Sequence, residues 1–186
     1  AAEAEARALG YNPIPTSRAV EHLRKEARIW QKDLEDEEIR SINKYTYNGT
    51  DDDGKKLFFK INEFLEGRYF PKDEREKEII LRNAGFINEG ISKFKLNDDI
   101  IVYRNDFYPD QLAKKNEKFL STSVVPDATL RRQANVAIIV PKGSNGAYIE
   151  LLAMDKYKKQ REFVINRKSD LNLLSVQKGM YIYELR

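Results

Sequence analysis

The spacing of apolar residues changes near Asp99, and this change limits the possible folds more than any other feature of the chain. Before it, apolar residues recur every three or four positions, which predicts amphipathic helices. The stripes include Val20, Leu23, Ala27 and Trp30, and later Ile80, Ala84, Ile87 and Ile91. After it come short β-branched and aromatic runs separated by turn residues, which predict strands. We therefore expect an α+β protein, mainly helical over about residues 1–95 and mainly β over 99–186.

The predicted strands lie at residues 100–104, 119–123, 136–140, 147–152, 162–165 and 180–185. Most of the intervening segments are too short to hold a crossover helix, so neighbouring strands should run antiparallel. With 186 residues, the chain is long enough for one sizeable core and short for two. We expect a single domain over residues 1–186, in which an N-terminal helical layer packs on two mostly antiparallel sheets.

The composition excludes several kinds of chemistry. The chain has no cysteine, so it has no disulfide, thiol nucleophile or cysteine-ligated zinc, and its single histidine, His22, argues against a zinc site or a histidine-based triad. The formal net charge of +3 predicts no strong field toward nucleic acid. No apolar run approaches the roughly 20 residues of a membrane span. Any reaction must therefore use carboxylates, amides, hydroxyls and arginines.

Three polar segments are candidates for one site. Gln160 and Glu162 stand two residues apart at the start of an apolar run, and in a strand such residues point to the same face. Arg104 ends a predicted strand, where a guanidinium meets either water or an anion. The hydroxyl run at residues 121–123 lies on another predicted strand, where such residues also pair across sheets. Each segment by itself has an ordinary structural explanation.

Together and in this order, the three segments resemble the bacterial mono-ADP-ribosyltransferase toxins, whose arginine, Ser-Thr-Ser and Gln/Glu-x-Glu elements build an NAD site. The resemblance runs from about residue 45 to residue 186. Within that family, the chain is most similar to the small clostridial-type exoenzymes that modify Rho GTPases, because these carry Gln-x-Glu where many relatives carry Glu-x-Glu. Two further matches are the run at residues 142–144, Lys-Gly-Ser, and an aromatic residue, Tyr157, three positions before Gln160.

The resemblance implies catalytic roles for four residues. Glu162 would bind the ribose hydroxyls and stabilise the positive charge that develops as nicotinamide leaves. Arg104 would hold the dinucleotide by charge-assisted hydrogen bonds. Ser121 would orient Glu162. Gln160 would contact the acceptor through its amide, which both donates and accepts hydrogen bonds.

The resemblance also implies a set of binding residues. Asn62 and Thr122 would belong to the NAD site, together with Arg104, Ser121 and Glu162, and Thr122 and Ser123 would brace their strand. Arg132, or the adjacent Arg131, resembles the arginine that contacts phosphate from a mobile loop of the family. Tyr157 would press on the partner protein.

One position departs from the family pattern. Relatives have Ile-Asn-x-x-Leu-Arg on a helix that faces the dinucleotide, whereas this chain keeps Asn62 but has Glu66 in place of the arginine. An anion near the phosphates would repel them, so Glu66 must point elsewhere or Arg68 must compensate. We therefore expect weak NAD affinity.

The implied function is that of a secreted toxin acting in the host cytosol. It would cleave its co-substrate NAD and transfer ADP-ribose to an asparagine of a Rho-type GTPase, with NAD hydrolysis as a side activity and no metal. We expect a monomer with no nucleic-acid partner and no membrane span. Two alternatives stay open. One is an NAD glycohydrolase, or a transferase acting on arginine or actin, at the same site; the other is a non-enzymatic interaction domain.

Overall fold

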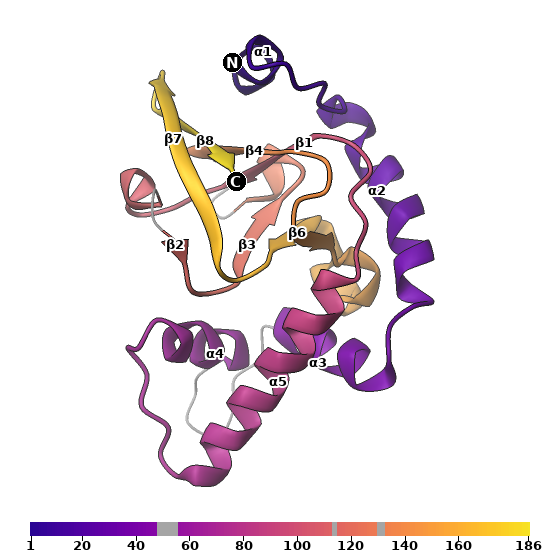
Figure 1. The fold of residues 1–186 in the computed structure, drawn as a ribbon, viewed down its shortest axis with the longest axis vertical. Helices are drawn as coiled ribbons and strands as arrows, with labels where there is room; N and C mark the ends of the chain where they lie inside the picture. Colours follow the sequence, from indigo (N-terminus) through magenta and orange to yellow (C-terminus); the bar gives the residue numbers. More distant parts are fainter. Residues whose placement is uncertain (48–55, 113–114, 130–132) are drawn as a thin grey trace.

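The computed structural model describes residues 1–47, 56–112, 115–129 and 133–186 (Figure 1). Its first half is helical, as the spacing of apolar residues predicts. The helices are α1 (Ala2–Ala8), α2 (Thr16–Gln31), α3 (Asp36–Thr46), α4 (Leu57–Leu65) and α5 (Glu74–Ser92). Side-chain caps begin two of them, α3 and α5. The Asp73 carboxylate accepts a hydrogen bond from the Glu76 amide at 2.8 Å before α5, and Glu35 and Glu38 form a capping box at α3.

The second half is built of strands and short 3-10 turns. The strands are β1 (Ile100–Arg104), β2 (Lys115–Asn116), β3 (Leu120–Ser123), β4 (Val136–Val140), β5 (Gly146–Tyr148), β6 (Glu162–Ile165), β7 (Ser169–Gln177) and β8 (Met180–Leu185). The apolar pattern does not predict β2, which is two residues long, or β7, which is mostly not buried. The expected strand at 147–152 is wrong beyond Tyr148, because the chain turns there into the 3-10 helix η4 (Glu150–Leu152).

The strands of the described residues form one hydrogen-bonded series in the order β2-β7-β8-β4-β1-β3-β6-β5. Only β4 and β8 pair in parallel there, so the mostly antiparallel arrangement is confirmed. The expectation of two sheets differs in one respect. Strand β1 pairs with β4 over five residues but with β3 at a single pair, Tyr103 with Ser123. The two expected sheets are therefore joined at this β1–β3 junction rather than separate.

The helical layer packs directly on the strands, and in Figure 1 helices α3, α4 and α5 lie below them while α2 runs alongside. The indole nitrogen of Trp30 donates a hydrogen bond to the Gly90 carbonyl at 2.8 Å, which ties α2 to α5. A Cβ at Gly90 would lie 2.9 Å from Ile42 Cδ1, so glycine leaves room there for the Ile42 side chain between α3 and α5. Phe94 then contacts both the Trp30 ring and the Phe163 ring of β6 edge to face. One buried cluster thus includes residues of both halves.

No helix of the residues described above has the length and apolar character needed to span a membrane.

Candidate active site

Arg104 is the last residue of strand β1 and lies next to the junction with β3. Its guanidinium donates one hydrogen bond to the backbone carbonyl of Ser121, at 2.5 Å, and another to the Asp106 carboxylate, at 2.9 Å. Burial alone would raise the pKa of Asp106, but the hydrogen bond and positive charge of Arg104 outweigh it and hold that pKa below its usual value. Arg104 Nε is buried without a hydrogen-bond partner among the described residues. Each terminal nitrogen has a second N–H and the side chain is 20% exposed, so the anchored guanidinium can still donate to a ligand.

Ser121 is held by residues of the helical layer. The phenol of Tyr45 in α3 lies 3.0 Å from the Ser121 hydroxyl, and Asn62 of α4 donates to the same phenol at 3.1 Å. The Asn62 carbonyl accepts the backbone amide of Phe119 at 3.1 Å, just before β3 begins. Burial, and secondly the charge of Glu162, raise the pKa of Tyr45 to about 12, so its phenol keeps its proton. Asn62 is thus a support of the serine, and Tyr45 is a site residue that no motif marks.

Gln160 and Glu162 face the same cleft, but not because both lie in a strand. Gln160 ends the 3-10 helix η5 (Asp155–Gln160), and Glu162 begins β6. Arg161 between them has φ 48° and ψ 51°, in the left-handed region. The expected i, i+2 strand geometry is therefore wrong, and a left-handed turn brings the two side chains to one place instead.

Burial dominates the electrostatics of Glu162. It raises the pKa of the carboxyl to about 7, although a hydrogen bond from Ser121 and the positive charge of Arg104 both act to lower it. Strand β3 pairs antiparallel with β6, which sets Ser123 opposite Glu162 and Ser121 close by. The carboxyl is thus largely shielded from water, and the Ser121 hydroxyl and the Arg104 guanidinium favour its ionised form.

Two cavities with shared walls make up the cleft. The smaller, of about 150 Å³, is lined by Tyr45, Thr46, Phe58, Ser121, Gln160 and Glu162. The larger, of about 500 Å³, shares four of these residues and extends along the β1–β3 junction past Arg104 and residues 121–123 to Thr129. The candidates Arg104, Ser121, Gln160 and Glu162 therefore come together around one space, although they come from three distant parts of the chain.

The other predicted residues have varied placements. The Thr122 hydroxyl is buried and donates to the Phe163 carbonyl at 2.6 Å, which fastens β3 to β6. The Ser123 hydroxyl accepts the Val125 amide at 3.1 Å. Arg131 and Arg132 lie outside the described residues. Tyr157 belongs to η5, but its side chain is not among those described.

Glu66, which replaces the arginine of the family pattern, ends α4 in a small charge network. One of its carboxylate oxygens lies 3.5 Å from the Arg68 guanidinium, and the other lies 3.5 Å from Lys118 Nζ. The rest of the Arg68 fork is bound to Glu63, at 2.8 and 3.1 Å. Arg68 and Lys118 therefore compensate the charge of Glu66 together.

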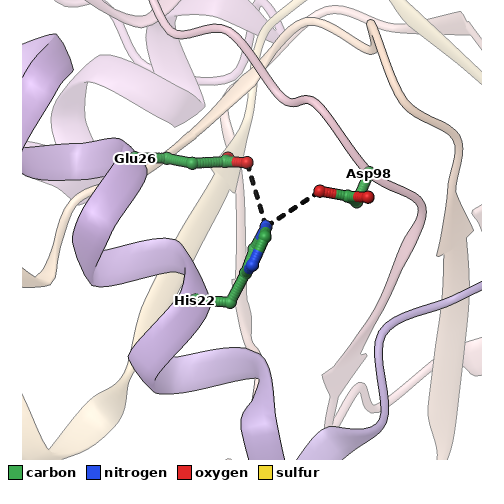
Figure 2. A group of neighbouring side chains, drawn as sticks. All are labelled: His22, Glu26 and Asp98. Atoms are coloured by element: carbon green, nitrogen blue, oxygen red, sulfur yellow. Dashed lines mark hydrogen bonds and ion pairs between the residues drawn. The ribbon is translucent and has the colours of Figure 1, made fainter.

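The one cluster of possible metal ligands found in the described part of the chain lies apart from the cleft. His22 and Glu26 of α2 and Asp98 before β1 converge there (Figure 2). The His22 Nε2 atom lies 3.1 Å from a Glu26 oxygen and 2.9 Å from an Asp98 oxygen. Histidine and carboxylates satisfy one another at these distances, and none of the three residues lines the cleft. We assign no metal to this cluster.

The fold is that of ADP-ribosyltransferase toxins, as comparisons with known proteins show. Residues 110–181 match the family model described as ADP-ribosyltransferase exoenzyme. The NAD(+)--arginine ADP-ribosyltransferase EFV of Enterococcus faecalis is 31% identical over an alignment 160 residues long, which covers 78% of this chain and 30% of that protein. The chain therefore spans less than a third of that relative's length.

Solved structures share the fold over nearly the whole chain. The toxin Plx2a of Paenibacillus larvae, an ADP-ribosyltransferase, has a TM-score of 0.65 at 23% identity, covering 94% of this chain and 96% of Plx2a. The C3 exoenzyme of Clostridium limosum has a TM-score of 0.67 at 17% identity, with the same two coverages. The predicted α+β fold and the predicted resemblance to these toxins are confirmed.

Proposed function

We propose that this chain is an NAD-dependent mono-ADP-ribosyltransferase. The observation that carries the proposal is the convergence of Arg104, Ser121 and Glu162 on one cleft. An anchored guanidinium that is still 20% exposed suits the diphosphate or ribose of a dinucleotide, because charged donors bind such oxygens strongly. The match of residues 110–181 to the exoenzyme family supports the same reaction.

Glu162 would act on the ribose of NAD. The bond between ribose C1′ and the nicotinamide nitrogen breaks, its electron pair moves to the nicotinamide, and positive charge develops on the sugar. A fixed carboxylate that is shielded from water stabilises that charge more than one in water does. Nicotinamide leaves as a neutral molecule, so its departure requires no added proton. An acceptor nitrogen then bonds to C1′ and releases its proton to solvent.

Gln160 favours an amide acceptor. It is exposed at the rim of the cleft, two residues from Glu162. An amide can both donate to and accept from an asparagine side chain, whereas it supplies no negative charge to a guanidinium. We therefore propose an asparagine of a Rho-type GTPase, reached in the host cytosol by an exported protein. An arginine acceptor is the second candidate, because the curated relative is named as an arginine transferase.

Transfer to defined acceptors tests the proposal. The protein would be incubated with labelled NAD and either a recombinant Rho-type GTPase or agmatine, a small guanidine. We expect label on the GTPase, located on an asparagine by mass spectrometry, and none with the Glu162→Ala variant. Label on agmatine alone would assign the arginine acceptor. If the wild-type protein released no nicotinamide with either acceptor, the proposal would be wrong.

A further inference from the structure

A buried carboxylate outside the cleft holds two arginines together. Glu150 is 2% exposed and follows the edge strand β5. Arg24 of α2 grips it with two hydrogen bonds, from Nε at 2.7 Å and from Nη2 at 2.9 Å. Arg161 Nη1 donates to the Oε1 oxygen of Glu150, which also accepts from Arg24 Nη2. A buried carboxylate bound by two arginines holds their side chains in place, because removing either partner leaves a buried charge unsatisfied.

Arg161 is the residue between Gln160 and Glu162, and its backbone is unusual. A left-handed conformation costs a residue with a side chain about 1 kcal/mol or more, so something must hold it there. Its amide donates to the Lys158 carbonyl at 3.0 Å, and its carbonyl accepts the Val124 amide at 3.0 Å. The side-chain contact with Glu150 is a third restraint on this residue.

The two cleft residues beside Arg161 are held differently. Glu162 belongs to β6, and its carbonyl accepts the Ile149 amide at 3.1 Å, so the sheet positions it independently. Gln160 lies outside the sheet, at the end of η5. The direction of the Gln160 side chain therefore depends strongly on the conformation of Arg161, whereas the direction of the Glu162 side chain depends on it far less.

We propose that Arg24, Glu150 and Arg161 form a positioning device that aims Gln160 at the acceptor and ties this setting to helix α2. The proposal rests on the proposed transferase function and extends it. None of the three residues lines the cleft, so none is expected to contact NAD. The device acts on the transfer step through the placement of Gln160, and misplacement of such a group by about 1 Å costs up to about a hundredfold in rate.

Two variants separate this role from plain stability. Arg161→Gly removes the contact with Glu150 while glycine accepts the left-handed backbone without strain. Arg24→Ala removes the link to α2, and Arg28→Ala, an exposed arginine one turn along the same helix, is the matched control. Transfer rates would be measured at varied NAD with the acceptor that the wild-type protein modifies, after circular dichroism has verified folding.

We expect Arg161→Gly to lower kcat for transfer by tenfold or more, with KM for NAD within about twofold of the wild-type value. Arg24→Ala should lower kcat by a smaller factor, and Arg28→Ala should have the wild-type rate. Unchanged transfer in Arg161→Gly would overturn the proposal even if its Tm fell, and so would a parallel loss of NAD binding. If Arg161→Gly fails to fold, Arg161→Asn, which tolerates the left-handed backbone and removes the guanidinium, takes its place with the same criteria. A wild-type protein that transfers nothing would instead contradict the proposed function.

Discussion

The phenol oxygen of Tyr45 lies 3.0 Å from the hydroxyl oxygen of Ser121. Through this contact, a helix of the N-terminal layer supports a residue of the cleft 76 positions further along the chain. The Tyr45 ring also packs edge to face on Phe119, next to β3. The helical layer is thus part of the site and more than a cover for the sheet.

Removing the Tyr45 hydroxyl should therefore affect activity. Tyr45→Phe keeps the buried ring but deletes the hydrogen bonds to Ser121 and Asn62. A neutral hydrogen bond contributes about 1 kcal/mol, so we expect kcat/KM to fall by about three- to tenfold. Tyr47→Phe, which changes an exposed tyrosine just past the same helix, is the control. Equal activity in the two variants would mean that Tyr45 has no influence on Ser121.

The pH dependence of the reaction should follow Glu162. Its pKa is raised to about 7, so the ionised form that the proposed mechanism needs appears as pH rises through that value. We expect kcat/KM to increase between about pH 6 and 8 and then level off. In the NAD complex, the cationic nicotinamide favours the carboxylate, so kcat should have a lower midpoint. A profile for kcat/KM that is flat across this range would contradict the assignment.

The same carboxyl should destabilise the fold at higher pH. Between the ordinary value of 4.5 and about 7, the folded protein keeps a proton that the unfolded chain has lost, so stability falls as pH rises. Allowing for the partial exposure of the side chain, the loss is about 2 kcal/mol. Glu162→Gln should therefore be the more stable protein above about pH 7 in urea denaturation, and should lose that advantage near about pH 4.

Gln160 should separate transfer from NAD cleavage. Because its proposed contact is with the acceptor, Gln160→Ala should lower transfer by about a hundredfold and leave NAD hydrolysis within about threefold. Gln160→Glu adds a carboxylate that can hold a guanidinium, so it should gain activity on agmatine. Both activities would be measured in one reaction, from nicotinamide release and from labelled acceptor. A parallel fall of the two in Gln160→Ala would place the residue on the NAD side.

Glu66 should weaken the binding of the dinucleotide. It draws the cations of Arg68 and Lys118 to itself, at 3.5 Å each. Glu66→Gln frees these charges, so we expect the Kd for NADH, which lacks the cationic leaving group, to fall by about threefold at low salt. The gain should shrink at about 0.5 M salt, where exposed charges are screened. Glu78→Gln on α5 is the control, and calorimetry gives both constants.

The buried ion pair between Lys60 of α4 and Glu76 of α5 should control the stability of the fold in acid. Glu76 accepts hydrogen bonds from Tyr69 at 2.6 Å and from Lys60 at 3.0 Å, and these, with the Tyr69 bond foremost, lower its pKa to about 2. The stability that this shift contributes is about 3 kcal/mol above pH 4.5 and is lost as pH falls toward 2. Glu76→Gln should therefore unfold more easily at neutral pH by about that amount, with Glu74→Gln in the same first turn as the control.

The sequence predicts the elements of this protein better than it predicts their junctions. The change of apolar spacing at Asp99 is local, and so are the arginine, hydroxyl and Gln-x-Glu motifs, which is why the fold and four cleft residues could be expected. Tyr45 and Glu150 could not, since their partners lie 76 and 126 positions away. The left-handed backbone of Arg161 could not be predicted from the sequence either, because arginine does not favour that conformation.

The lone Tyr103–Ser123 pair makes the β1–β3 junction the seam of the sheet. Arg104 stands on one side of that seam, and Ser121 and Glu162 stand on the other. A dinucleotide held by all three would join the two sides of this seam. Its binding should therefore slow hydrogen exchange in both halves at once, including strands that it never touches.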